Sequence, residues 1–192
     1  MSEDQRLVAE LLSGDEARAE AAVEGLVRLG PPALDALLPA LRSDSADARW
    51  WAARAVAGIP DRRSAAALTE ALDDPDAGVR QAAALGLRLQ PSPDAADRLA
   101  RLLTDDDPIT ARLASEALAA LGPQALAHLT AAARSPEVGA RIHAVRALAR
   151  AREPRAIPIL FEALEDSSAM VQHWAERGLE DLGVGMVFFP PA

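Results

Sequence analysis

Tryptophan, arginine and histidine are the side chains of this sequence whose types and spacing could do chemistry. The chain has three tryptophans and no tyrosine, and all of its 20 basic residues are arginine. A guanidinium binds carboxylates through paired hydrogen bonds, and tryptophan supplies contact area where binding energy concentrates. These residue types are typical of molecular recognition.

The three histidines, His128, His143 and His173, do not form a pattern that predicts catalysis. His143 and His173 fall near the starts of neighbouring predicted helices, but two histidines without a clustered carboxylate or thiolate make a poor metal site. The sequence contains no cysteine, no serine–histidine–carboxylate arrangement and no glycine-rich phosphate loop. We therefore predict no catalytic residues, no metal, no cofactor and no enzymatic activity.

A repeat of 30 or 31 residues positions these side chains. Its core is a small–small–aliphatic triplet at helical spacing, which lets two helices approach closely. The copies are Ala22/Gly25/Leu26, Ala52/Ala55/Val56, Ala83/Gly86/Leu87, Ala114/Ala117/Leu118, Ala144/Ala147/Leu148 and Ala175/Gly178/Leu179.

Each triplet is preceded by a helix with its own apolar stripe. The stripe's first ladder is Leu7, Leu37, Leu68, Leu99, Leu129 and Leu160. Four residues later comes a second ladder, formed by Leu11, Leu41, Leu72, Leu103, Ala133 and Leu164. Positions i and i+4 share one face of a helix, so these residues predict the buried face.

Turn residues repeat in the same register. Between units stand Pro31, Pro60, Pro91, Pro123 and Pro154, where a proline opens a helix without losing a needed donor. Within units one turn position holds Ser13, Ser43, Asp74, Asp105, Ser135 and Asp166. The pattern predicts an all-α fold of twelve helices without strands, an α-solenoid of about six helix–turn–helix repeats that forms one domain over residues 1–183.

The chain resembles the HEAT-like repeat family in its short form, with the pattern D-P-x-x-x-V-R-x-x-A-A-x-x-L. The best matching residues are Asp74, Pro75, Val79, Arg80, Ala83, Ala84 and Leu87. The resemblance implies that second helices line a concave face where partners bind. Short repeats of this kind also resemble those of phycobilin lyase subunits. HEAT-like hydroxylases bind iron through His-Glu dipeptides, and His143-Ala144 and His173-Trp174 do not match that motif.

The variable positions of the second helices hold all three tryptophans and several arginines. We predict that these residues form a partner-binding row on the concave face: Trp50, Trp51, Arg54, Arg112, His143, Arg146, His173, Trp174 and Arg177. For any single tryptophan, filling a gap between repeats is an equally good interpretation.

Composition limits the classes of partner. The net charge of −9 and the pI near 4.8 argue against nucleic acid, because phosphate binding needs a positive field. No apolar run approaches membrane length, and the polar start MSEDQRLVAE is unlike a signal peptide, so we expect a cytoplasmic protein that binds no membrane.

The last nine residues, 184–192, depart from the repeat. Met186, Val187, Phe188 and Phe189 form an apolar segment. We expect this segment to fold back and cap the last repeat, the alternative being that it docks into another protein or a neighbouring chain.

Two functions from different classes fit the sequence. The first is a non-enzymatic protein-binding scaffold or adaptor, whose arginine-rich and tryptophan-rich row suits an acidic or carboxylate-bearing protein or peptide. The alternative is a bilin or tetrapyrrole lyase-type or chromophore-chaperone subunit. In that case Arg54, Arg146 and Arg177 would pair with propionates and the tryptophans would stack on a pyrrole.

Overall fold

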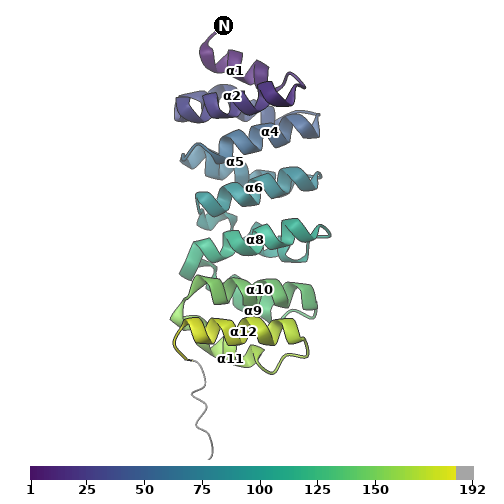
Figure 1. Cartoon of the computed structure of the whole chain (residues 1–192), viewed down its shortest axis with the longest axis vertical. Helices are drawn as coiled ribbons and strands as arrows, with labels where there is room; N and C mark the ends of the chain where they lie inside the picture. The colour runs from purple at the N-terminus through teal and green to yellow at the C-terminus, as the bar shows by residue number, and fades with distance from the viewer. Residues whose placement is uncertain (185–192) are drawn as a thin grey trace, which may run out of the picture. The chain divides into compact units, whose positions relative to one another are not determined.

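A computed structural model describes residues 1–184, and this part of the chain is helical and contains no strand (Figure 1). The first helices of the six repeats are α1 (Glu3–Leu11), α3 (Leu34–Leu37) with η2 (Leu38–Arg42), α5 (Arg62–Ala71), α7 (Ala96–Arg101) with η4 (Leu102–Thr104), α9 (Leu126–Ala133) and α11 (Ile157–Ala163). The second helices are α2 (Glu16–Leu29), α4 (Ala46–Ala57), α6 (Ala77–Leu89), α8 (Pro108–Leu121), α10 (Val138–Ala151) and α12 (Ala169–Asp181). The predicted α-solenoid of six helix–turn–helix repeats is confirmed.

The chain divides into two compact units, which are described separately below. Unit 1 is Met1–Arg98, and unit 2 begins at Leu99. In unit 1 the second helices α2, α4 and α6 pack in chain order, and in unit 2 α8, α10 and α12 do the same. The predicted domain over residues 1–183 stays a prediction. The apolar segment at Met186–Phe189 lies outside the described residues.

The small–small–aliphatic triplets form the core as predicted, because every residue of all six triplets is buried. The need for small residues is visible at Gly86, where a Cβ would lie 2.7 Å from Leu68 Cδ1 and 2.8 Å from Ala57 Cβ. Gly178 is in a similar position against Ala149. Each glycine therefore allows a second helix to contact the preceding second helix and its own first helix at the same point.

The leucine ladders are also buried for most of their length. In the first ladder Leu37, Leu68, Leu99, Leu129 and Leu160 are buried, and Leu7 in the first repeat is half-buried. In the second ladder Leu41 and Leu164 are half-buried.

The repeated turn residue shapes the loop between the two helices of a repeat. In all six repeats its side-chain oxygen accepts a hydrogen bond from the backbone N–H two residues later, over 2.8–3.3 Å. In four repeats that later residue then caps the second helix; Asp76, for example, accepts from the Val79 N–H at 3.1 Å. Two consecutive short-range hydrogen bonds therefore set where each of these second helices begins.

Arginines in the first turn of second helices join adjacent repeats. Arg49 of α4 makes two hydrogen bonds to the Asp74 carboxylate, at 2.7 and 2.9 Å, and Arg141 of α10 does the same to Asp166, at 2.7 and 3.1 Å. Each arginine also donates to two carbonyls of the loop that precedes its own helix. The aspartate that forms the turn therefore also joins that turn to the preceding repeat.

The prolines between repeats differ in one respect from the prediction. Pro31, Pro123 and Pro154 lie in the short 3-10 segments η1 (Pro31–Ala33), η5 (Gly122–Ala125) and η6 (Pro154–Ala156). Pro60 and Pro91 instead precede their helical segments, which begin at α5 and at η3 (Pro93–Ala95). The physical reason at Pro60 is that the next residue, Asp61, has extended backbone and caps α5 with its side chain.

Candidate partner-binding face

The predicted binding residues all lie on second helices, but they are not equally accessible. Six of them are half-buried: Trp50, Trp51, Arg54, His143, Arg146 and Trp174. Three are exposed: Arg112, His173 and Arg177. The neighbouring variable positions Ala82 and Leu113 are buried, at 9% exposure each. Part of this face is therefore packed inside the protein and is not accessible to a partner.

In unit 1 the structure brings Trp50, Trp51 and Arg54 together on α4. The two indole rings meet edge to face, with centroids 4.7 Å apart and planes at 77°. The guanidinium carbon of Arg54 lies 5.4 Å from the Trp50 centroid and 5.3 Å from the Trp51 centroid, within the range of a cation–π contact. Arg54 also donates to Glu20 of α2 at 2.6 Å, so a carboxylate from the preceding repeat balances its charge.

In unit 2 several arginines converge on one carboxylate. Arg112, Arg146 and Arg150 lie 2.9, 3.3 and 3.4 Å from the same Glu116 oxygen. Glu116 is only 10% exposed, whereas the side chains of Arg112 and Arg150 are 45% and 52% exposed. One negative charge thus faces three positive charges, and two of the three guanidinium groups are open to solvent.

Trp174 extends this cluster onto α12. Arg146 lies 5.9 Å from the Trp174 ring centroid, and His173 meets the same ring edge to face with centroids 5.5 Å apart. We name the group of Arg112, Glu116, Arg146, Arg150 and Trp174 the arginine cluster. Among the described residues, no hydrogen bond, ion pair or cation–π contact joins Arg177 to this cluster.

Burial changes the electrostatics beneath the arginine cluster. Desolvation and the charge of Arg150 lower the pKa of Arg146, whose Nε is buried without a hydrogen-bond partner among the described residues. Desolvation and the charge of Arg146 also lower the pKa of His143. Both effects favour the neutral form of the half-buried His143 imidazole. The Nδ1 atom of His143 is buried and has no hydrogen-bond partner among the described residues.

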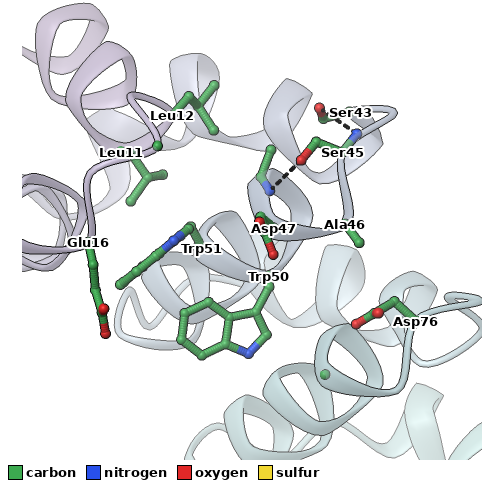
Figure 2. A pocket seen from close by; sticks show the side chains of 13 residues that line it. Leu11, Leu12, Glu16, Ser43, Ser45, Ala46, Asp47, Trp50, Trp51 and Asp76 are labelled. Atoms are coloured by element: carbon green, nitrogen blue, oxygen red, sulfur yellow. Dashed lines mark hydrogen bonds between the residues drawn. The ribbon is translucent and has the colours of Figure 1, made fainter.

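A cleft of about 720 Å³ opens in unit 1 beside the paired tryptophans (Figure 2). Trp50 and Trp51 line it together with the loop ends of α2, α4 and α6. The carboxylates of Glu16, Asp47 and Asp76 also line it, and its described lining contains no basic side chain. We name this site the tryptophan cleft. Figure 2 shows the two indole rings between Glu16 on one side and Asp76 on the other.

Trp50 also packs against the next repeat. A Cβ built on Gly78 of α6 would lie 3.3 Å from Trp50 Cδ1, so the indole rests on the first turn of that helix. One edge of Trp50 therefore fills a gap between two repeats, which is the alternative role expected for a single tryptophan. The ring also contacts Trp51 and Arg54, and part of its surface lines the tryptophan cleft.

A second groove in unit 1, of about 910 Å³, runs along η2 and α5. Its charged residues take part in ion pairs, such as Arg63–Asp35 at 2.8 Å and Arg42–Glu70 at 3.5 Å, and its lining holds no aromatic residue. Among the described residues no group of three or more acidic or histidine side chains could hold a metal ion. No helix in the described range is long and apolar enough to cross a membrane.

Sequence reasoning missed the carboxylates of both sites. Glu20 and Glu116 occupy variable positions of second helices, yet the face was interpreted as basic. Glu16 and Asp47 stand in first helical turns, where acidic residues are common because they favour the helix dipole. No signal in a single repeat separates such a residue from one that lines a cleft, since the cleft is formed by three repeats together.

Comparison with known proteins agrees with the geometry. A family profile described as HEAT repeats matches residues 5–88, 66–140 and 126–184. The chain therefore belongs to the HEAT repeat family, as the sequence resemblance predicted.

Among curated proteins, the chain is similar to the phycocyanin alpha phycocyanobilin lyase CpcF of Synechocystis sp. (strain ATCC 27184 / PCC 6803 / Kazusa). The two are 49% identical over 70 residues, which is 36% of this chain. The match spans about a third of the length of that relative, 33%.

Two solved structures illustrate the shared architecture. The complex of CpcE and CpcF of phycocyanin lyase from Nostoc sp. PCC7120 aligns with a TM-score of 0.62 and 25% identity, over 75% of this chain and 96% of that one. A designed armadillo repeat protein in complex with the peptide (KR)4 aligns with a TM-score of 0.54 and 20% identity, over 94% of this chain and 100% of that one. At 20% sequence identity, the similarity to the designed armadillo protein shows only a shared fold.

Proposed function

We propose that this HEAT repeat protein is a non-enzymatic protein-binding scaffold or adaptor that uses the variable face of its second helices. The observation that supports this most is the arginine cluster of unit 2. There, Arg112 and Arg150 hold exposed guanidinium groups around a carboxylate that cannot balance them all. Such a surface suits an acidic segment of a protein partner, because each guanidinium can bind a carboxylate through two hydrogen bonds.

Accessible arginines give the cleanest test of this proposal. Arg146 and Trp174 are half-buried, so truncating them removes packing as well as binding groups. Arg112 and Arg177 are exposed, and their replacement by Ala leaves the core intact. A matched control is the pair Arg134 and Arg155, which are exposed on the first-helix side of the same unit.

The experiment compares partner recovery by three tagged versions of the full chain in lysate of the source cell. We expect Arg112→Ala/Arg177→Ala to lose a protein that the parent and Arg134→Ala/Arg155→Ala both retain, as quantified by mass spectrometry. Equal recovery by all three proteins would contradict a partner-binding role for the second-helix face of unit 2. Circular dichroism of the variants verifies that helicity is unchanged.

The second candidate function is a bilin or tetrapyrrole lyase-type or chromophore-chaperone subunit. Its support is the 49% identity over 70 residues with the phycocyanobilin lyase CpcF. In this role Arg54 and Arg146 would bind propionate groups, and the indoles beside them would stack on the pyrrole rings. Titration of the full chain with a linear tetrapyrrole, followed by visible absorption, tests it: a saturable red shift supports this function, and an unchanged spectrum contradicts it.

A further inference from the structure

We infer that the tryptophan cleft of unit 1 binds a lysine-bearing or arginine-bearing segment of a protein partner. This site differs in position and in charge from the arginine cluster of unit 2. The arginine cluster suits acidic segments, whereas the tryptophan cleft suits basic ones. The inference does not depend on the function proposed above.

The chemistry of the lining selects a cation. Glu16 and Asp47 line the cleft, and neither makes a hydrogen bond or an ion pair with another described residue. The third carboxylate, Asp76, caps α6 through the Val79 N–H. The described lining therefore holds three carboxylates and no basic side chain, which favours an incoming ammonium or guanidinium group.

The indole pair adds two features that a simple acidic surface lacks. Aromatic faces attract cations, and Arg54 already shows that these two rings accept a guanidinium at 5.3–5.4 Å. Because Glu20 balances the charge of Arg54, that arginine repels a second cation only weakly. Neither indole N–H donates a hydrogen bond to another described residue, so both can bind carbonyl oxygens of a peptide backbone.

The dimensions fit a peptide side chain with part of its backbone. A volume of about 720 Å³ lies within the range of small-ligand pockets and exceeds what a bare ion needs. The aliphatic stem of a lysine or arginine can lie along the apolar part of the lining, where Leu12 is 43% exposed. Its charged end then reaches the carboxylates.

The test uses the full chain and two blocked hexapeptides of alternating sequence, acetyl-(Gly-Arg)3-amide and acetyl-(Gly-Glu)3-amide, in isothermal titration calorimetry at low salt. We expect the arginine peptide to bind and the glutamate peptide to bind at least tenfold more weakly at the cleft. Trp51→Ala should weaken arginine-peptide binding about tenfold, which corresponds to loss of a cation–π and packing contact.

Two glutamates of α2 can distinguish binding at the tryptophan cleft from the general attraction of a basic peptide to an acidic protein. Glu16 and Glu24 are both exposed residues of α2, but only Glu16 lines the cleft. We expect Glu16→Gln to weaken binding about three- to tenfold and Glu24→Gln to change it less than twofold, because screening attenuates more distant charges. Equal effects of the two variants, or no binding of the arginine peptide to the parent, would overturn the inference.

Two further variants test the cleft if the Trp51→Ala protein does not fold. Trp51→Phe retains most of the packing with a weaker cation–π face, and it should still reduce affinity. Phe161→Leu, at an exposed aromatic residue of α11 in unit 2, should leave affinity unchanged. If Phe161→Leu weakens binding as much as Trp51→Phe does, the loss is not specific to the cleft and the cleft assignment is wrong.

Discussion

Arg141 and Asp166 form a two-hydrogen-bond ion pair that joins α10 to the turn before α12, with side chains only 15% and 12% exposed. Arg49 and Asp74 form the same pair in unit 1, at the same separation of 25 residues. Because each aspartate also forms the turn of its own repeat, one carboxylate stabilises both a loop and a contact between repeats.

This relationship predicts an acid-sensitive contribution to stability. The hydrogen bond from Arg141 lowers the pKa of Asp166 below its ordinary value. A carboxylate with a lowered pKa in the folded state stabilises the protein above the unfolded-state value, near 3.9, and loses that contribution as the pH falls through the folded-state pKa. Asp166→Asn should therefore lose about 1–3 kcal/mol of unfolding free energy at pH 7.

Urea unfolding at pH 7, 4 and 3 checks this prediction. The difference between parent and Asp166→Asn should shrink as the pH falls below about 4, because the unfolded state of the parent then binds a proton at Asp166 before the folded state does. Glu165→Gln is the control, because it neutralises an adjacent exposed residue. A difference that stays constant across the three pH values would contradict the assigned role of the ion pair.

Two glycines should respond to alanine with opposite signs. Gly86→Ala would place a methyl group 2.7 Å from Leu68 Cδ1 and 2.8 Å from Ala57 Cβ, so we expect a loss of about 1–3 kcal/mol from overpacking. Gly139, near the start of α10, has open space around it, and alanine there should stabilise by up to about 1 kcal/mol. Thermal unfolding of both variants measures these changes in stability. A Gly86→Ala variant more stable than the parent would contradict the close packing of α6 against α4 and α5.

Removing a ladder leucine should destabilise unit 1 strongly. Leu68 is fully buried, and Leu68→Ala should cost about 2–5 kcal/mol. Leu89, at the end of α6, is 65% exposed, and Leu89→Ala should change stability by less than about 0.5 kcal/mol. Chemical denaturation of the two variants measures the contrast, and comparable losses would show that the ladder is not the core face.

His143 should titrate below the ordinary value near 6.5. Burial and Arg146 both lower its pKa, so Arg146→Met should raise that pKa towards the ordinary value by removing the charge. Because the folded state holds the neutral form, the unfolded state binds a proton first as the pH falls below about 6.5, and stability declines from there. Nuclear magnetic resonance of the histidine ring protons measures the pKa, with the remote Arg155→Met as control; an unchanged value in Arg146→Met would disprove the coupling.

The repeat architecture could be predicted from the sequence because its constraints are local. Small residues at Ala83 and Gly86, a turn residue at Asp74 and an apolar ladder through Leu68 each have one physical explanation, and all recur at one period. Register within a repeat then follows from helix geometry and from capping. The six helix–turn–helix repeats of residues 1–184 and most of their buried face follow from these residues.

The candidate sites could be predicted only in part, because they depend on which side chains of adjacent repeats meet. The positions of Trp50, Trp51 and Trp174 on second helices were correctly predicted. Their charge environment was not, since the pairing of Arg54 with Glu20 arises only when two helices are packed together. The tryptophan cleft could not be predicted either, because its lining comes from three repeats that meet only in the folded protein.

The division of the three tryptophans between the two units gives the chain an intrinsic spectroscopic label for each. Trp50 and Trp51 belong to unit 1 and Trp174 to unit 2, and the sequence contains no tyrosine to add emission. In Trp174→Phe the fluorescence would report on Met1–Arg98 alone, and in Trp50→Phe/Trp51→Phe it would report on the segment from Leu99 onward. The unfolding of each half, and ligand binding at each candidate site, could then be followed in the intact chain without an attached dye.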